Sequence, residues 1–354
     1  MKKYVALYRT IKERIINGEY KAGSKLPSKR VMTDKTGYSV ITVEKAYSML
    51  IEEGYIAAKE RSGYYVCVPD IPGIEKKQRH IPAIKYLEED LTDMPSADFE
   101  YSLWFKTIRK VIAEKGNTLF VKSPNKGCAG LRNAISEYLL RYRGMVAQPQ
   151  QIIIGSGSEQ LYESVITILG RDKIYGIEDP SYKQIEAVYS GEGAKIEKLK
   201  MGEDGIKSDA LDNSSIDVLH VTPFNSYPTG VTTSILKRYE YLKWAKNGRY
   251  IIEDDFNSEF FIPGQPIEPL YSLDTEERVI YINTFSKSLS PSMRMGYMIL
   301  PRELESTYDE KLGRFSCSVP VLDQYVLAEF ISSGNFERHL NRMRRKMKLD
   351  TKSL

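Results

Sequence analysis

The feature that most constrains the fold is a series of short apolar runs, separated for the most part by stretches with helical spacing. The runs are three or four residues long and are typical of buried strands: Ile152–Ile154, Ile174–Ile177, Val218–Val221, Tyr250–Ile252, Val279–Ile282 and Tyr297–Leu300. Strands that alternate with helices form mostly parallel sheets covered by helices. The sequence therefore predicts an α/β fold here, and a length of 354 residues leaves room for a second domain at roughly 100–200 residues per domain.

Composition excludes several other classes of protein. Apolar residues make up 42% of the chain and charged residues 28%, which is ordinary for a globular protein. No apolar run approaches the roughly 18–20 residues of a membrane-spanning helix. Lys12, Glu13 and Arg14 interrupt what would be the apolar core of a signal peptide, so we expect a cytoplasmic protein without a membrane partner. The three cysteines and three histidines are widely spaced, and no metal site is expected.

The N-terminal segment is basic and has a pattern of its own. Residues 1–68 contain 13 Lys or Arg and 7 Asp or Glu, a net charge of +6, whereas the whole chain carries +4. Such a basic segment suggests a polyanionic partner. The predicted elements are helices over Leu7–Ile16, over Arg30–Lys35 after a Ser28 cap and from Ser39 onward, then strands over Tyr55–Ala58 and Tyr64–Val68. This order predicts a winged helix-turn-helix, whose second helix of the pair can enter a major groove.

Motifs across this segment resemble the GntR family of bacterial regulators. They are Ile16-x-Gly18, Ala22-Gly23-x-x-Leu26-Pro27-Ser28-x-Arg30, Thr42-Val43-x-x-Ala46-Tyr47-x-x-Leu50, Glu53-Gly54-Tyr55-Ile56 and Ser62-Gly63-Tyr64. The resemblance implies binding to double-stranded operator DNA, mostly through phosphate contacts, by Ser28, Arg30, Ser39, Thr42, Lys45 and Arg61. The family usually places an arginine or another polar residue after the serine that opens the recognition helix. Here the run is Ser39-Val40-Ile41-Thr42, so base reading by an arginine at that point is not expected. A helix-turn-helix used only for protein contact is the alternative.

Residues 69–97 read as a linker. Prolines and a glycine punctuate the segment, which has no sustained period: Pro69, Pro72, Gly73, Pro82 and Pro95. The predicted organisation is a winged helix over 1–68, a linker over 69–97 and an α/β domain over 98–354.

Polar and charged residues follow several of the predicted strands. Gly155–Gln160 is a small polar turn between a strand and a helical run, which is typical of an anion site at a helix N-terminus. Glu253-Asp254-Asp255 follows one strand, and Lys287 and Arg294 follow another. Open α/β sheets bind ligands at the carboxyl ends of their strands, and a lysine with an acidic partner is what pyridoxal phosphate requires. A surface lysine and a solvated acidic turn are the alternative.

Four motifs occur in an order that resembles the fold-type-I aminotransferase domain of MocR-type regulators, which join a GntR head to an aminotransferase-like body. The motifs are Glu178-Asp179-Pro180-x-Tyr182, Pro223-x-x-x-x-Pro228-Thr229-Gly230, Ile252-Glu253-Asp254-Asp255-Phe256-x-Ser258-Glu259-Phe260 and Thr284-Phe285-Ser286-Lys287-x-Leu289-x-Pro291-x-x-Arg294-x-Gly296-Tyr297. The resemblance implies that pyridoxal 5′-phosphate forms a Schiff base with Lys287 and that its ring nitrogen pairs with Asp254. It further implies stacking by Tyr182 and phosphate binding by the backbone amides of Ser158 and Glu159 and by Thr284, Ser286 and Arg294.

The body departs from the family pattern at three places. Phe256 stands where the family usually has a tyrosine that bonds the phenolic oxygen of the cofactor, and Tyr227 is the candidate to replace it. Residues 122–128 lack the tyrosines of the family's approach loop. The sequence ends at Leu354, before the family's C-terminal small domain and its carboxylate-binding arginine, so efficient transamination is not expected.

These observations favour a homodimeric transcriptional regulator whose body senses pyridoxal phosphate or an amine that reacts with it. Two alternatives stay open. One is a pyridoxal-phosphate-dependent aminotransferase acting on an amino acid, and the other is a cofactor-free body that serves only for dimerisation.

Overall fold

The computed structural model describes residues 2–67, 99–246, 248–256, 258–260 and 268–350. The predicted linker over 69–97 lies outside these residues. The chain divides into two units, Met1–Asp90 and Leu91–Leu354, and each is described here by itself. We call the described part of the first unit the head and that of the second the body.

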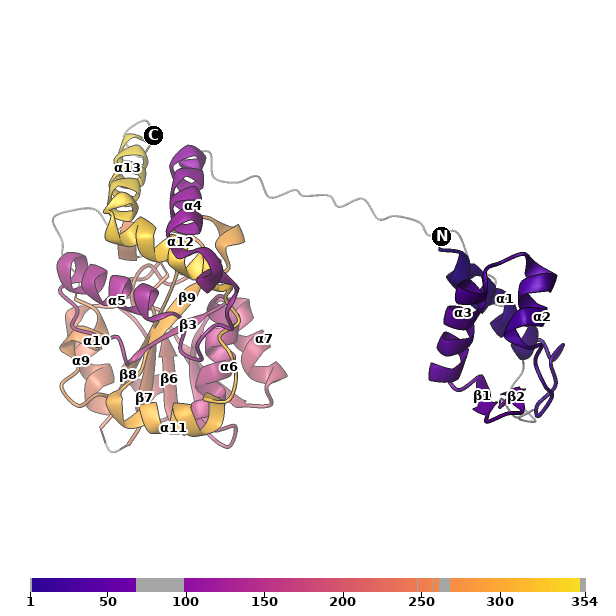
Figure 1. The fold of residues 1–354 in the computed structure, drawn as a ribbon. Coiled ribbons are helices and arrows are strands. Elements are labelled where there is room, and N and C mark those ends of the chain that lie inside the picture. Colours follow the sequence, from indigo (N-terminus) through magenta and orange to yellow (C-terminus); the bar gives the residue numbers. More distant parts are fainter. Residues whose placement is uncertain (1, 68–98, 247, 257, 261–267, 351–354) are drawn as a thin grey trace. The chain divides into compact units, whose positions relative to one another are not determined.

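The head is a winged helix-turn-helix, as the sequence predicts (Figure 1). Its elements are α1 (Lys3–Ile16), α2 (Lys29–Thr36), α3 (Val40–Glu52), β1 (Ile56–Lys59) and β2 (Gly63–Val66). Ser28 and Ser39 cap α2 and α3, because their hydroxyls accept the backbone N–H groups of Val31 and Thr42, each at 3.3 Å. Gly37 ends α2 in a left-handed conformation, with φ +69°, and this conformation allows the tight turn into α3.

A small core holds the three helices of the head together. The inward face of α3 carries Val43, Ala46, Tyr47 and Leu50, each no more than 1% exposed, and this face packs against α1. The Tyr47 hydroxyl donates to the Pro27 carbonyl oxygen at 2.7 Å. The start of α2 is therefore tied to the middle of α3, which fixes the geometry of the helix-turn-helix pair.

The body is built on a seven-stranded sheet of order β3-β9-β8-β7-β6-β4-β5. The strands are β3 (Ile152–Gly155), β4 (Ile174–Asp179), β5 (Lys195–Lys200), β6 (Val218–Val221), β7 (Tyr250–Asp254), β8 (Val279–Thr284) and β9 (Gly296–Ile299). Among these described strands only β9 runs antiparallel to its neighbours, so the predicted mostly parallel α/β sheet is confirmed. The sequence reading missed β5, an edge strand whose lysines hide the apolar pattern of a strand.

Helices cover both faces of this sheet (Figure 1). The longer ones are α4 (Tyr101–Lys115), α5 (Ala129–Tyr138), α6 (Ser158–Leu169), α7 (Lys183–Gly191), α9 (Ile235–Trp244), α11 (Arg302–Leu312), α12 (Val321–Ser332) and α13 (Asn335–Asp350). Shorter helical turns are Gly116–Phe120, Leu139–Arg143, α8 (Ser208–Asp212), Ser258–Phe260, α10 (Leu270–Leu273) and Pro291–Met293. No helix in the described ranges is both long and apolar enough to cross a membrane.

Alternation along the strands divides the apolar residues between the two faces of the sheet. On β8, Ile280 and Ile282 pack with side chains of α6, α7 and α11. Tyr281 points to the opposite face and packs with side chains of α5, α12 and α13. Period-two alternation of this kind is what a sheet covered on both faces requires. The sheet is thereby fixed in the middle of the body, and the ends of its strands are left to form a site.

Candidate functional site

A cavity of about 320 Å³ lies at the carboxyl ends of the parallel strands. Register brings the contributing segments together, because Gly296 at the start of β9 pairs with both Gly155 at the end of β3 and Thr284 at the end of β8. All nine body residues predicted from the resemblance line this one cavity: Ser158, Glu159, Tyr182, Tyr227, Asp254, Thr284, Ser286, Lys287 and Arg294. Tyr162, Thr222 and Phe256 also line the cavity. Of these three, the sequence indicated only Phe256.

One end of the cavity is formed by the N-terminus of α6. Gly157 precedes the helix with φ +105°, and a Cβ there would lie 2.9 Å from Nη2 of Arg294. Glycine suits this position because other residues are strained at a positive φ and because a Cβ would require the guanidinium group to shift. Arg294 also forms an ion pair of 2.6 Å with Glu159. Helix N–H groups, a guanidinium and the hydroxyls of Ser158 and Thr284 are together a donor set for a phosphate.

Asp254 lies in the interior of the cavity and is 5% exposed. The Tyr162 hydroxyl donates a hydrogen bond to its Oδ2. Burial, together with the charge of Asp254, raises the pKa of Tyr162 well above its ordinary value, so this hydroxyl stays protonated and remains a donor. On the same carboxylate, Nε2 of His220 stands 3.7 Å from Oδ2, and Nδ1 of His220 is 2.7 Å from the Tyr189 hydroxyl. The Tyr162 hydroxyl therefore holds Oδ2 of Asp254, while the His220 ring lies beside the same oxygen beyond hydrogen-bond distance.

The two acids that flank Asp254 have other partners. Glu253 is fully buried and accepts the backbone N–H groups of Leu270 and Tyr271, at 2.9 and 2.8 Å. Asp255 is also fully buried and forms an ion pair with Arg143 at 3.0 Å. Alternation along β7 thus leaves Asp254 as the one member of the acidic run that lines the cavity.

Lys287 lies at the mouth of the cavity, with part of its side chain exposed. Its Nζ is 5.1 Å from the centroid of the Phe256 ring and 5.6 Å from that of Phe260. Loss of water around the amine lowers the pKa of Lys287, and the charge of Glu259 opposes this shift. A lowered pKa enlarges the neutral fraction of the amine, which is the nucleophilic form.

Two tyrosines also line the cavity. Tyr182 and Tyr227 are 41% and 61% exposed, and their ring centroids lie 6.2 Å apart. Behind them, Glu178 at the end of β4 accepts the Ser226 hydroxyl at 2.6 Å and the Thr222 N–H at 3.2 Å. Burial raises the pKa of Glu178 to about 7, although both hydrogen bonds oppose the shift. This carboxyl joins the loops that carry the two tyrosines.

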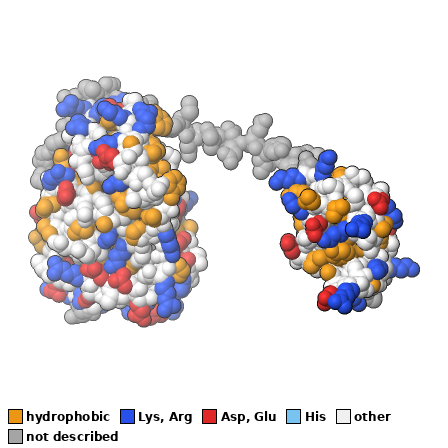
Figure 2. Space-filling view, in the orientation of Figure 1, with side chains coloured by type: hydrophobic (Ala, Val, Ile, Leu, Met, Phe, Trp, Pro, Cys, Tyr) orange, Lys and Arg blue, Asp and Glu red, His pale blue; other side chains and the backbone are white. Residues whose placement is uncertain are grey.

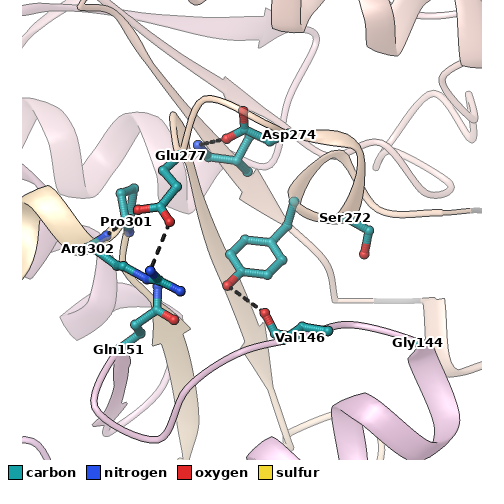
Figure 3. A pocket seen from close by; sticks show the side chains of 10 residues that line it. Gly144, Val146, Gln151, Ser272, Asp274, Glu277, Pro301 and Arg302 are labelled. Atoms are coloured by element: carbon teal, nitrogen blue, oxygen red, sulfur yellow. Dashed lines mark hydrogen bonds and ion pairs between the residues drawn. The ribbon is translucent and has the colours of Figure 1, made fainter.

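A second cavity, of about 240 Å³, lies at the other end of the strands, where β3 and β8 begin (Figure 3). Its charged side chains are engaged with one another or with backbone. Glu277 forms an ion pair of 3.4 Å with Arg302, and Asp274 accepts the Val279 N–H at 2.9 Å. This cavity therefore offers fewer free groups to a ligand than the first. Within the described residues, no group of three or more His, Cys, Asp or Glu side chains could hold a metal ion.

The head carries the six residues predicted to contact DNA. Five of them are exposed, and Thr42 is partly buried with its hydroxyl 2.9 Å from that of Ser39. Arg61 lies in the turn of the β1–β2 hairpin with φ +55°. On the face shown in Figure 2, Lys and Arg side chains of the head lie beside exposed hydrophobic ones. Contact of these residues with DNA stays a prediction.

Comparison with known proteins identifies both units. Residues 3–66 match the model of the bacterial regulatory proteins of the gntR family. The chain is 34% identical over 351 residues to the HTH-type transcriptional regulator YdeL of Bacillus subtilis, which covers 97% of this chain and 76% of that protein. It is 28% identical to the probable rhizopine catabolism regulatory protein MocR of Rhizobium meliloti, over 96% of this chain and 73% of that protein. It is 29% identical to the pyridoxine biosynthesis regulator PdxR of Corynebacterium glutamicum, over 96% of this chain and 75% of that protein.

Solved aminotransferases resemble the body. An archaeal alanine:glyoxylate aminotransferase superposes with a TM-score of 0.64 at 25% identity, over 73% of this chain and 66% of that one. LysN, the alpha-aminoadipate aminotransferase of Thermus thermophilus, was solved with N-(5′-phosphopyridoxyl)-L-leucine. It gives a TM-score of 0.63 at 27% identity, over 70% of this chain and 64% of that one. The chain thus spans about two thirds of these enzymes' length.

The match of the head to the gntR family, the sheet topology of the body and the similarity to regulators over nearly the whole chain all indicate the same family. The chain belongs to the MocR-type transcriptional regulators of the GntR family, with a GntR winged helix joined to an aminotransferase-like body.

Proposed function

We propose that the body binds pyridoxal 5′-phosphate at Lys287 and that its occupancy, or its reaction with an amine, changes the affinity of the head for operator DNA. The observation that carries this proposal is the convergence of nine residues from six separate segments on one cavity. Support also comes from the relatives, since one is named as a regulator of pyridoxine biosynthesis and LysN was solved with a phosphopyridoxyl compound.

The residues present fit this cofactor. When bound, pyridoxal phosphate supplies an aldehyde that reacts reversibly with amines. Arg294 and the start of α6 would hold the phosphate, beside a glycine whose replacement by any larger residue would collide with the guanidinium. Asp254 would keep the ring nitrogen protonated, because a nearby anion favours the charged form. Lys287 would hold the cofactor covalently, and Tyr182 would cover one face of the ring.

Phe256 cannot hydrogen-bond the cofactor's phenolic oxygen, since its side chain has no polar atom. Tyr227 lines the same cavity and has a hydroxyl, and we propose that it takes this role. The weaker alternative is a body that serves only as a dimerisation platform, and Phe256 is the residue that favours it. In either case we propose a homodimer, for which exposed apolar side chains such as Phe120, at 88%, and Leu236, at 78%, provide contact surface.

The test combines absorbance with DNA titration. We expect the full-length chain to gain a visible absorbance band when pyridoxal phosphate is added, and Lys287→Ala to lose that band. Lys183→Ala is the matched control, because Lys183 is exposed on α7 and does not line the cavity. The protein is then titrated onto DNA from its own upstream region at fixed salt, because phosphate contacts make the affinity salt-dependent.

Three outcomes separate the candidates. DNA affinity that changes with pyridoxal phosphate in the wild type but not in Lys287→Ala supports the proposal. Affinity that is indifferent to the cofactor, in a protein that stays colourless, refutes it in favour of the dimerisation platform. Turnover of an amino acid without specific DNA binding would point to an enzyme.

A further inference from the structure

The recognition helix of the head begins with two exposed apolar side chains. Val40 and Ile41 form the first residues of α3, directly after the Ser39 cap. Val40 is 46% exposed and Ile41 is 66% exposed. Single exposed apolar residues are common on protein surfaces. These two, however, stand at the N-terminal end of the helix that a helix-turn-helix places against base edges, and their position therefore bears on DNA recognition.

Helical spacing turns Ile41 away from the core of the head, and neither Val40 nor Ile41 belongs to the cluster of side chains that forms this core. Residues Val43, Ala46 and Leu50 mark the inward face of α3, and at 100° per residue Ile41 lies on the opposite side. Lys45, one turn further on, is exposed on the same outward face. Neither Val40 nor Ile41 is needed to complete the hydrophobic core. Their apolar surface is available to whatever the start of α3 approaches.

The polar groups next to this pair are already engaged within the head. Ser39 accepts the Thr42 N–H at 3.3 Å and lies 2.9 Å from the Thr42 hydroxyl. Glu44, three residues after Ile41, forms an ion pair with Lys29 of α2, so its charge is balanced before any DNA approaches. The first turn of α3 therefore presents an apolar tip surrounded by satisfied polar groups.

A major groove offers one kind of apolar group to such a tip. Each base pair presents donors and acceptors there, and thymine alone of the four standard bases adds a C5-methyl group. Valine and isoleucine can neither donate nor accept a hydrogen bond, so the only base feature that they can read favourably is that methyl group. We propose that Val40 and Ile41 are specificity-determining residues that contact thymine methyl groups, and that the operator carries thymines where the start of α3 enters the groove.

This proposal rests on DNA binding by the head and is independent of cofactor binding by the body. The experiment begins with selection of high-affinity duplexes from a random-sequence library by the full-length protein. Each thymine of the selected duplex is then replaced in turn by uracil, which removes only the methyl group. Dissociation constants are measured at one fixed salt concentration.

We expect recurrent thymines in the selected duplexes and a loss of about fourfold in affinity for each contacted methyl group removed, the value of one buried CH₂ or CH₃ group. Replacing cytosine by 5-methylcytosine at neighbouring positions tests whether a methyl group in the major groove raises the affinity when the base is not thymine. If the proposal holds, Ile41→Ala and Val40→Ala each lose the preference for thymine over uracil at the position that the replaced side chain contacts, and the double variant binds thymine and uracil duplexes with nearly equal affinity. Both changes are at exposed positions, and alanine favours helix, so the head still folds.

Ile51→Ala is the matched control, since Ile51 is 38% exposed but lies in the last turn of α3. This variant keeps the preference for thymine over uracil. Equal affinity of the wild type for thymine and uracil duplexes overturns the proposal, and so does a preference that survives unchanged in the double variant of Val40→Ala and Ile41→Ala. Failure to select any duplex above random sequence overturns DNA recognition by the head itself. Cofactor binding by the body is measured separately by absorbance, so this result is distinguishable from failure of cofactor binding.

Discussion

Replacement of Glu178 by glutamine tests the electrostatics behind the cavity. Glu178 is 3% exposed, and burial raises its pKa to about 7 from an ordinary value of 4.5. The folded body therefore keeps this proton over a pH range in which the unfolded chain has lost it, and stability falls as the pH rises through that range. Between pH 5 and 8 the cost is about 2.5 kcal/mol, since each pH unit between the two pKa values is worth about 1.4 kcal/mol.

Glutamine has nearly the same shape as the protonated carboxyl and cannot ionise. It can accept the Thr222 N–H and still bond the Ser226 hydroxyl, so both contacts of Glu178 have a replacement. The free energy of unfolding falls between pH 5 and pH 8 in both proteins. We expect this decrease to be smaller in Glu178→Gln than in the wild type, by about 2.5 kcal/mol. The remaining pH dependence comes in part from Glu253 and Glu259, whose pKa values burial also raises to about 7.

The assay is urea denaturation followed by tryptophan fluorescence at several pH values. Trp104 and Trp244 are the two tryptophans of the chain, and both lie in the body, so unfolding of the head does not contribute to the signal. Asp179→Asn is the control, because Asp179 is the exposed neighbour of Glu178. Parallel pH profiles for the wild type and Glu178→Gln would refute the reasoning.

Three further changes probe the body and the head. Arg143→Met leaves the carboxylate of Asp255 buried without its cation, and urea denaturation should show a loss of about 3–5 kcal/mol. Gly157→Ala places a Cβ 2.9 Å from Arg294 at a positive φ. The concentration of pyridoxal phosphate needed for half-saturation should rise about tenfold, as a strain of about 1–3 kcal/mol implies. Arg30→Ala removes one predicted phosphate contact, so the slope of log affinity against log salt should become shallower by about one.

Each of these variants has a control of the same residue type. Arg141→Met is exposed on the same helical turn as Arg143, and its stability should match the wild type. Gly191→Ala meets nothing within 4 Å and should leave cofactor affinity unchanged. Arg14→Ala, in the last turn of α1, should leave the salt slope unchanged. A variant indistinguishable from its control contradicts the corresponding prediction.

Local signals in the sequence were sufficient where the structure is decided locally. Serines at helix starts predicted the caps of α2 and α3, and apolar runs predicted the central strands, because both depend on a few adjacent residues. The edge strand β5, with the sequence Lys-Ile-Glu-Lys-Leu-Lys, was missed. Its two apolar residues, Ile196 and Leu199, pack on opposite faces of the sheet with charged residues between them, so neither an apolar run nor an apolar alternation marks this edge strand.

The site was only partly readable for a related reason. Strand-end patterns indicated the Gly155–Gln160 turn, the acidic run, Lys287 and Arg294, but the nine lining residues, Asp254 among them, came from the resemblance. Only the pleat of β7 shows why Asp254 lines the cavity. Tyr162 lies one helical turn after Ser158, so helix spacing could have indicated it. The contact of His220 with Asp254 joins β6 to β7, and no local pattern in either strand reports such a lateral contact.

The ion pair between Glu159 and Arg294 makes binding at the start of α6 an exchange of anions. An incoming anion must displace a carboxylate that already sits on the guanidinium, so it gains only the difference between two ion pairs. A monoanionic carboxylate ligand gains almost nothing from such an exchange. A phosphate dianion brings more charge and more acceptor oxygens to the same helix end. For the phosphate binding proposed above, the resident glutamate would therefore favour phosphate esters over the free amino acids and keto acids that resemble them in size.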